Sequence, residues 1–186
     1  MRPVFARLLC LSVIFCVCIS APRFALAEGS EIWHVKAVHP EGELLAIKAI
    51  GKAGELYDVK AIAESGNRHM LSIKAFIDGK PMPLKVLASD DFYGPVKALD
   101  TKGTIYDVKA ITADGDKLDV KAVSRSGSIL DIKAIGPQQR FFGIKAISPS
   151  GHVYDVKGVK MLDEAIEQEV NGIPIRAHIK ALPQVD

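Results

Sequence analysis

The 186-residue sequence contains few of the groups that commonly perform catalysis or hold metal ions. Its three cysteines (Cys10, Cys16 and Cys18) all lie near the N-terminus, so the rest of the chain offers no disulfide and no thiolate ligand. It has one tryptophan and five histidines, and it lacks the HExxH and GxSxG motifs. These absences predict a protein that is not an enzyme and that has no catalytic residues, no cofactor and no metal site.

The N-terminal segment has the pattern of a secretory signal peptide. Arg2 and Arg7 precede an apolar run over residues 8–21, and Ala25-Leu26-Ala27 fits the small-x-small cleavage rule. The apolar run is shorter than the roughly 18–20 residues that a membrane-spanning helix needs. We therefore expect cleavage of residues 1–27 and export of a single domain, residues 28–186, to the periplasm or the extracellular space, with no transmembrane segment.

Removal of this segment changes the charge balance of the chain. The segment holds three of the 24 basic residues and no acidic residue, so 21 basic residues remain against 22 acidic ones. A strongly basic chain would favour nucleic acid or a membrane surface as the partner. The near-neutral mature chain gives no such indication, and no nucleic-acid partner is expected.

A lysine recurs about every twelve residues in the setting apolar-Asp-Val-Lys-Ala-Ile, followed by a short polar stretch with glycine. The period-two pattern places Val and Ala on one face and Asp and Lys on the other, which predicts a strand. The connections are too short for a helical crossover, so neighbouring strands are expected to be antiparallel. The twelve lysines are Lys36, Lys48, Lys60, Lys74, Lys85, Lys97, Lys109, Lys121, Lys133, Lys145, Lys157 and Lys180.

The turn residues also predict a register. A three-residue hairpin loop at 113–115 places Lys109 opposite Asp119, and the same register in the next hairpin places Lys121 opposite Asp131. Opposite charges then meet while the valines stay on one face, as a specified register requires. We expect an all-β antiparallel meander of about twelve short strands.

The units also form three groups of four, because Tyr57, Tyr106 and Tyr154 each mark the third unit of a group. The tyrosines form either a symmetric core layer, which we favour, or three sugar-stacking platforms. Three four-strand repeats predict a sheet closed about one threefold axis, with a β-trefoil-like closure first and a β-prism or barrel next. The repeats run over about 31–79, 80–127 and 128–183.

The third repeat contains an insertion, residues 160–172, whose acid-rich stretch DEAIEQEV is expected to form a short helix. His34 and His178 occupy the aspartate position of the first and last strands. Closure of the sheet would bring them together as a metal pair, but exposed polar positions are the favoured interpretation.

The row of lysines indicates either an ion-paired strand face, which we favour, or a series of cations for a polyanion. Several lysines have aspartates to pair with. The candidate ligand-binding residues are those on strands that lack an aspartate at the usual position: Lys48, Lys85, Lys97 and Lys145.

The repeated DVKAI unit behind a signal peptide resembles an uncharacterised family of secreted bacterial proteins, a domain of unknown function. This resemblance implies no activity. Export, repetition and the lack of catalytic motifs predict a non-catalytic binding module for a glycan or another envelope polymer. The alternative is a structural or protein-interaction scaffold in the cell envelope.

Overall fold

The structure, a computed structural model, describes residues 29–124, 126–160 and 169–184. These residues form thirteen antiparallel strands in one sheet, and the one helix among them is the 3-10 turn η1 (Pro137–Gln139). The expected all-β antiparallel class is confirmed. The predicted signal peptide falls outside the described residues, as does most of the predicted helix of the insertion. The last two residues of that predicted helix are described, and they form the strand β12 (Glu169–Val170) instead. Among the described residues, no helix is long and apolar enough to cross a membrane.

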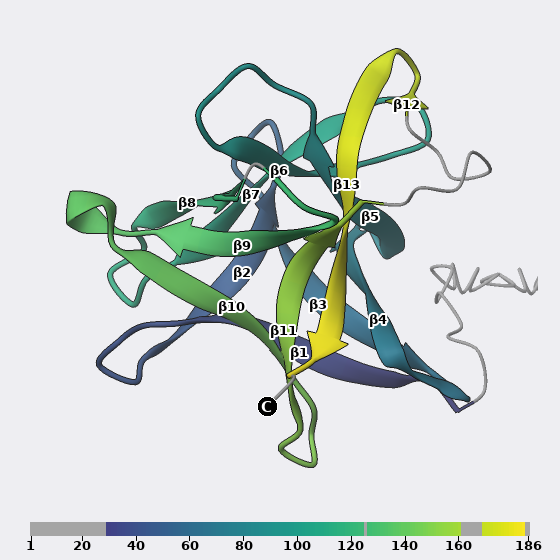
Figure 1. The fold of residues 1–186 in the computed structure, drawn as a ribbon, viewed down its shortest axis with the longest axis vertical. Coiled ribbons are helices and arrows are strands. Elements are labelled where there is room, and N and C mark those ends of the chain that lie inside the picture. The colour runs from purple at the N-terminus through teal and green to yellow at the C-terminus, as the bar shows by residue number, and fades with distance from the viewer. Residues whose placement is uncertain (1–28, 125, 161–168, 185–186) are drawn as a thin grey trace, which may run out of the picture.

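The strands follow the lysine repeat (Figure 1). They are β1 (Glu31–Val38), β2 (Leu44–Ile50), β3 (Leu56–Glu64), β4 (Asn67–Ile77), β5 (Lys80–Leu87), β6 (Gly94–Leu99), β7 (Ile105–Ile111), β8 (Lys117–Ala122), β9 (Ile129–Ile135), β10 (Phe141–Ile147), β11 (Val153–Val159), β12 (Glu169–Val170) and β13 (Ile173–Pro183). All except the two-residue β12 carry one of the twelve lysines. In β7, Val108 and Ala110 are buried while Lys109 between them is half-buried, which is the alternation expected for a strand with one face on the core.

The strands are arranged in groups of three. Along one of its two sides, each strand of a group pairs first with one of the other two strands and then with the other. β6 pairs with β8 through Gly94 and Pro95, and then with β7 through Lys97 to Leu99. The remainder of β7 pairs with β8. The three strands therefore enclose a small triangle, which we call a junction.

The twelve long strands form four junctions: β1–β2–β3, β4–β5–β13, β6–β7–β8 and β9–β10–β11. The free side of each strand pairs with a strand of a different junction. These two-stranded bridges are β1–β10, β2–β7, β3–β4, β5–β6, β8–β9 and β11–β13. Every junction is thus bridged to each of the other three, which is the connectivity of the corners and edges of a tetrahedron. Figure 1 shows the consequence, since the ribbons run in many directions instead of circling one axis.

Two lysines face each other in the middle of every bridge. The facing pairs are Lys36 and Lys145, Lys48 and Lys109, Lys60 and Lys74, Lys85 and Lys97, Lys121 and Lys133, and Lys157 and Lys180. In most bridges, the large apolar residue that precedes the lysine of one strand faces the small residue that follows the lysine of the other strand, and both lie on the inner face of the sheet. Ala49, for example, faces Val108, and Ile47 faces Ala110. These alternating large and small side chains belong to the main core cluster, where such alternation lets facing side chains interdigitate.

The bridge between β5 and β6 departs from this pattern. Val86 occupies a position that is alanine in most units, and it faces Val96. Room for it comes from two glycines, because a Cβ on Gly94 would lie 2.8 Å from Val86 Cγ1 and a Cβ on Gly158 would lie 3.3 Å from Val86 Cγ2. Gly158 is the residue that turns the repeated YDVKAI into YDVKGV, so packing against a larger neighbour accounts for that change.

The sheet closes on itself through its twelve long strands, as expected, but the predicted threefold relation between the repeats is wrong. β1 shares a junction with β2 and β3, whereas the first strand of the second repeat, β5, shares one with β4 and β13. The three repeats of about 48 residues are therefore not equivalent in the fold. Three junctions consist of consecutive strands, but β4–β5–β13 takes its third strand from the far end of the chain, and the bridges β1–β10, β2–β7 and β11–β13 join strands that are not consecutive.

The register prediction is correct in one hairpin and wrong in the next. Lys109 faces Asp119 as expected. Lys121 faces Lys133 instead of Asp131, because the backbone N–H of Val123 donates to the carbonyl of Asp131 and shifts β9 by two residues.

Candidate functional site: the lysine junctions

Four ion pairs around the junctions share one pattern. The lysine of one strand contacts an aspartate on the next strand, and that aspartate lies two residues before the next strand's own lysine. Lys109 Nζ, for example, donates to Asp119 Oδ1 across the β6–β7–β8 junction. This hydrogen bond is the main reason why the pKa of Asp119 lies below its ordinary value. The pKa values of Asp58, Asp107 and Asp131 are lowered in the same way, by Lys48, Lys97 and Lys157 respectively.

The prediction that Lys48, Lys97 and Lys145 lack a carboxylate partner is wrong. They pair with Asp58, Asp107 and Asp155, each ten residues further along the chain. The aspartate comes from the next strand and not from the lysine's own strand. The ten-residue spacing already used for Lys109 and Asp119 would have identified all three pairs in the sequence.

The β6–β7–β8 junction shows how the chain neutralises its lysines. Three lysines meet two aspartates there, since Lys97 pairs with Asp107 and Lys109 with Asp119, while Lys121 faces Pro95. A water-sized recess of about 20 Å³ lies at the centre of the junction, and the lysines and Asp119 line it. A carboxylate of the chain itself is therefore part of this lysine-lined recess.

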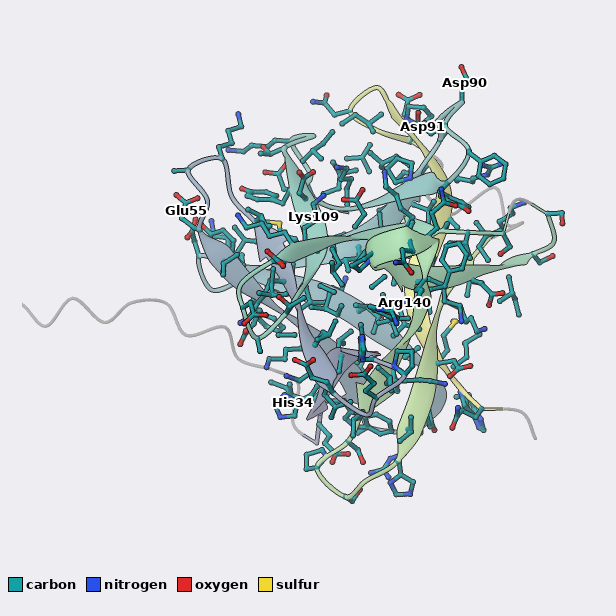
Figure 2. The ribbon with its side chains drawn as sticks, turned by 90° about the vertical axis from the view of Figure 1, so that its left-hand side faces the viewer. His34, Glu55, Asp90, Asp91, Lys109 and Arg140 are labelled. Carbon is teal, nitrogen blue, oxygen red and sulfur yellow. The ribbon has the colours of Figure 1, made fainter. Side chains whose placement is uncertain are left out.

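The other two junctions that carry aspartates resemble it to different degrees. The β9–β10–β11 junction also has three lysines and two aspartates, Asp131 and Asp155, and a similar recess. The β1–β2–β3 junction has Asp58 alone, and His34 Nδ1 lies 3.4 Å from Lys60 Nζ at another aspartate position. Figure 2 shows Lys109 and His34, which belong to different junctions, well apart on the molecule.

The β4–β5–β13 junction has three lysines and no aspartate at any of the facing positions. Non-acidic residues stand there instead: Lys74 faces Pro83, Lys180 faces Ser72 and Lys85 faces His178. The strand pairing is otherwise that of the other junctions. This junction therefore differs from its counterparts in charge much more than in backbone arrangement.

The side chains at this junction are close to one another and partly removed from water. Lys85 is only 4% exposed, and its Nζ lies 2.9 Å from His178 Nδ1. Lys180 Nζ donates to Ser72 Oγ at 3.2 Å. A serine hydroxyl is a neutral partner, so this hydrogen bond does not offset the charge of Lys180.

The pKa values of two of these lysines report the same crowding. Burial lowers the pKa of Lys74, and repulsion from Lys85 lowers it further. Burial also lowers the pKa of Lys180, with repulsion from both other lysines. The carboxylate of Glu64 opposes part of this effect at both residues. We take the β4–β5–β13 junction as the candidate site, and of the four predicted ligand-binding lysines it contains Lys85 alone.

An acidic hollow of about 350 Å³ lies among the connections β1–β2, β7–β8 and β9–β10. These connections belong to the three junctions other than β4–β5–β13, so in a tetrahedral arrangement the hollow lies opposite that junction. Its charged lining comprises Glu41, Glu43, Asp114, Asp116 and Arg140, together with His39. Among the described residues, the lining of the hollow is therefore mainly acidic, whereas the β4–β5–β13 junction has lysines at the equivalent position of all three strands.

The remaining sequence candidates are placed apart or within the core. His34 and His178 belong to different junctions, so the sheet does not bring them together. Tyr57, Tyr106 and Tyr154 all pack against the core. Within the part of the chain that the structure describes, no three His, Cys, Asp or Glu side chains are grouped to hold a metal ion.

Comparison with known proteins identifies a family but no activity. Residues 30–182 match a family described as a "Family of unknown function (DUF7486)", and the chain belongs to this family. No curated protein and no solved structure matches the chain.

Proposed function

We propose that this member of the DUF7486 family is an exported, non-catalytic binding module for an anionic glycan or another anionic polymer of the cell envelope. The observation that carries the proposal is the β4–β5–β13 junction, where Lys74 and Lys180 face Pro83 and Ser72 at the positions that aspartates occupy in other junctions. The same lysine position binds a carboxylate of the chain at the other junctions. An anionic group of a polymer would take that role here.

The charge distribution also supports an oriented approach. The lysines of this junction lie at one end of an axis whose other end is the acidic hollow. Such a separation of charge attracts a polyanion to one end and repels it from the other, even though the net charge of the mature chain is close to zero.

The proposal is tested by calorimetric titration of the mature chain with four polymers: a polyuronate, a polyphosphate, a sulfated glycan and a neutral glucan. We expect binding of anionic polymers and none of the glucan, and weaker binding in 0.5 M than in 0.05 M salt because the charges are then screened. If no polyanion binds at low salt, the proposal is wrong.

Variants localise the binding. The double variant Lys74→Gln/Lys180→Gln should bind polyanions less tightly by about tenfold or more, since it removes two charge-assisted contacts. The matched control is Lys36→Gln/Lys121→Gln. These lysines also face no aspartate (Ala46 and Pro95 stand opposite them), but they lie in two other junctions. Equal losses in both double variants would mean that the polymer binds the surface without preference for the β4–β5–β13 junction.

A further inference from the structure

Three aromatic side chains form an exposed cluster outside the β4–β5–β13 junction. Phe92 and Tyr93 end the β5–β6 connection, and Phe141 begins β10. The ring centroids of Phe92 and Tyr93 lie 4.7 Å apart, and those of Tyr93 and Phe141 lie 5.8 Å apart. Phe92 is 69% exposed and Phe141 is 44% exposed. Contiguous apolar groups at the surface of a protein mark a site of interaction.

The cluster lies across the β8–β9 bridge. Tyr93 precedes the buried Gly94 of β6, and Phe141 precedes the buried Phe142 of β10, so both rings belong to the outer face of the sheet. β6 pairs with β8 and β10 pairs with β9, so the rings come from opposite sides of this bridge. The fold does not require a ring at this position, because Leu56 occupies the equivalent exposed place at the start of β3.

Lys133 of the same bridge supplies a cation beside the rings. Gly143 stands opposite Lys133, and a Cβ on Gly143 would lie 4.0 Å from Lys133 Nζ. Phe141 and Gly143 are two residues apart on one face of β10, which is a spacing of about 7 Å. The ammonium group and the Phe141 ring are therefore close enough to contact one sugar residue together.

The positive charge of Lys133 is available to a ligand. Within the part of the chain that the structure describes, its ammonium group forms no ion pair. Lys133 acts on Asp131 through its charge, but that carboxylate is bound by another lysine. The two aspartates of the β9–β10–β11 junction pair with its other two lysines (Asp131 with Lys157, and Asp155 with Lys145).

We propose that Phe92, Tyr93, Phe141 and Lys133 bind one uronic-acid residue of a glycan. The C–H groups on one face of a pyranose ring pack against an aromatic ring, and the carboxylate of a uronate pairs with an ammonium group. An edge-to-face contact covers at most one face of each aromatic ring, so the sugar has faces to pack on. Aromatic rings with a few charged groups that fix orientation are typical of ligand sites. The inference goes beyond the proposed function, because the β8–β9 bridge is not part of the β4–β5–β13 junction.

Acidic residues at one end of the cluster orient the sugar. Asp90 and Asp91 precede Phe92, and Figure 2 shows them well apart from Arg140, which precedes Phe141. The sugar carboxylate is repelled at the Phe92 end and attracted at the other end by Lys133. We therefore expect the carboxylate to point toward β9.

The experiment titrates the mature chain at low salt with three tetramers: galacturonic acid, its full methyl ester and thymidylate. Calorimetry measures affinity, and saturation-transfer difference NMR measures which sugar C–H protons contact the protein. We expect the acid to bind about tenfold more tightly than the ester, which keeps the ring but lacks the charge, with saturation of its ring protons. The thymidylate tetramer offers stacking bases and phosphates, so tighter binding of it than of the acid would overturn the assignment to a glycan.

Variants localise the sugar. Phe141→Leu, which gives the position the residue found at Leu56, should weaken binding of the galacturonate tetramer by about threefold or more. Lys133→Gln should weaken it by about tenfold. Leu56→Ala and Lys36→Gln are the matched controls and should leave it unchanged, since Leu56 begins β3 and Lys36 faces Ala46 in the β1–β2–β3 junction. If Phe141→Leu does not fold, Tyr93→Leu replaces it.

The outcomes separate this inference from the proposed function. Polyphosphate has no ring to stack, so its binding should not respond to Phe141→Leu. If polyphosphate binds but the galacturonate tetramer does not, or if the ester binds as tightly as the acid, the sugar site is wrong and the binding module stands. The sugar site is also wrong if the folded aromatic variant and Lys133→Gln both bind the tetramer like the wild type. If both variants lose the tetramer and no polyanion responds to Lys74→Gln/Lys180→Gln, the sugar site stands and the site at the β4–β5–β13 junction is wrong.

Discussion

The β6–β7–β8 and β4–β5–β13 junctions have the same strand arrangement and three lysines each, yet aspartates face two lysines of the first junction and none of the second. The pairing of strands is therefore maintained without these aspartates. Cross-strand charge pairs contribute only about 0.2–1 kcal/mol each, whereas the buried residues on either side of every lysine form one continuous core. Because the core holds the backbone, the charge on the outer face of a junction can vary without loss of the fold.

The largest expected effect comes from the packing of β5, which distinguishes the β4–β5–β13 junction from the others. Gly158→Ala restores the residue that the repeat has elsewhere, but its Cβ would crowd Val86, Leu130 and Ile132. We expect the free energy of unfolding, measured by urea denaturation, to fall by about 1–3 kcal/mol. In a Val86→Ala background, Gly158→Ala should lower the free energy of unfolding by less, because the smaller side chain at position 86 leaves room for the new methyl group.

A glycine on the outer face provides the control for this experiment. A Cβ on Gly143 would lie 3.8 Å from Lys145 Cε, which is an ordinary contact. Gly143→Ala should therefore change stability little. The packing explanation would be contradicted if Gly158→Ala lowered the free energy of unfolding by the same amount in the wild type and in the Val86→Ala background.

Exchange of charge between the two junctions should have a smaller effect. Ser72→Asp gives Lys180 a carboxylate and offsets the repulsion among the three lysines, so we expect a gain of about 0.5–1 kcal/mol in the free energy of unfolding. Asp119→Asn in the β6–β7–β8 junction should lose a similar amount. Urea denaturation at neutral pH and low salt measures both. A loss of stability in Ser72→Asp would mean that the lysines of the β4–β5–β13 junction are already neutralised.

The two junctions should also respond differently to acid. The pKa values of Asp107 and Asp119 are lowered in the folded chain, so their stabilising contribution is present above the ordinary aspartate pKa of 3.8 and is lost as the pH falls through the folded values. Asp107→Asn/Asp119→Asn should therefore reduce the slope of stability against pH below about pH 4. Ser72→Asn, in the junction without aspartates, should leave that slope unchanged.

The smallest effect is expected in alkali and comes from the β4–β5–β13 junction. The pKa values of Lys74 and Lys180 are lowered in the folded chain, so the unfolded chain binds more protons between the folded values and the ordinary lysine pKa of 10.5. Their contribution to the free energy of unfolding should rise with pH over that interval. Thermal unfolding of the wild type and of Lys74→Gln/Lys180→Gln over this pH interval measures the rise in stability. If stability rises equally in both proteins, these lysines are not the cause of the rise.

The sequence was sufficient to predict the strands, their antiparallel pairing and the Lys109–Asp119 register, because all three depend on alternation and on turns between neighbouring residues. The β4–β5–β13 junction could not be predicted in this way. Pairing of β5 with β13 joins residues 85 and 178, and no local pattern specifies which distant strand completes a triangle. The repeats also make strand pairing difficult to predict from the sequence, because many strands have nearly the same residues and each could pair equally well with several others.

The candidate site was predicted only in part for the same reason. Lys85 was singled out because its own strand lacks an aspartate, but the relevant carboxylate position lies on β13, where His178 stands. Lys74 and Lys180 were assigned to the ion-paired face, and the structure places both of them opposite neutral residues, Pro83 and Ser72. Once the ten-residue rule is known, it explains the pairs within consecutive strands. It cannot locate Ser72 opposite Lys180.

The four junctions have a consequence for the behaviour of the chain at high concentration. An unpaired strand side is a template for adding strands from other molecules, and it is the usual starting point of fibril growth in β proteins. Each of the twelve long strands described here has neighbours along both sides, supplied by its bridge and by its junction. The twelve long strands thus offer another copy little unpaired backbone, and we expect this connectivity to disfavour the addition of strands from other molecules.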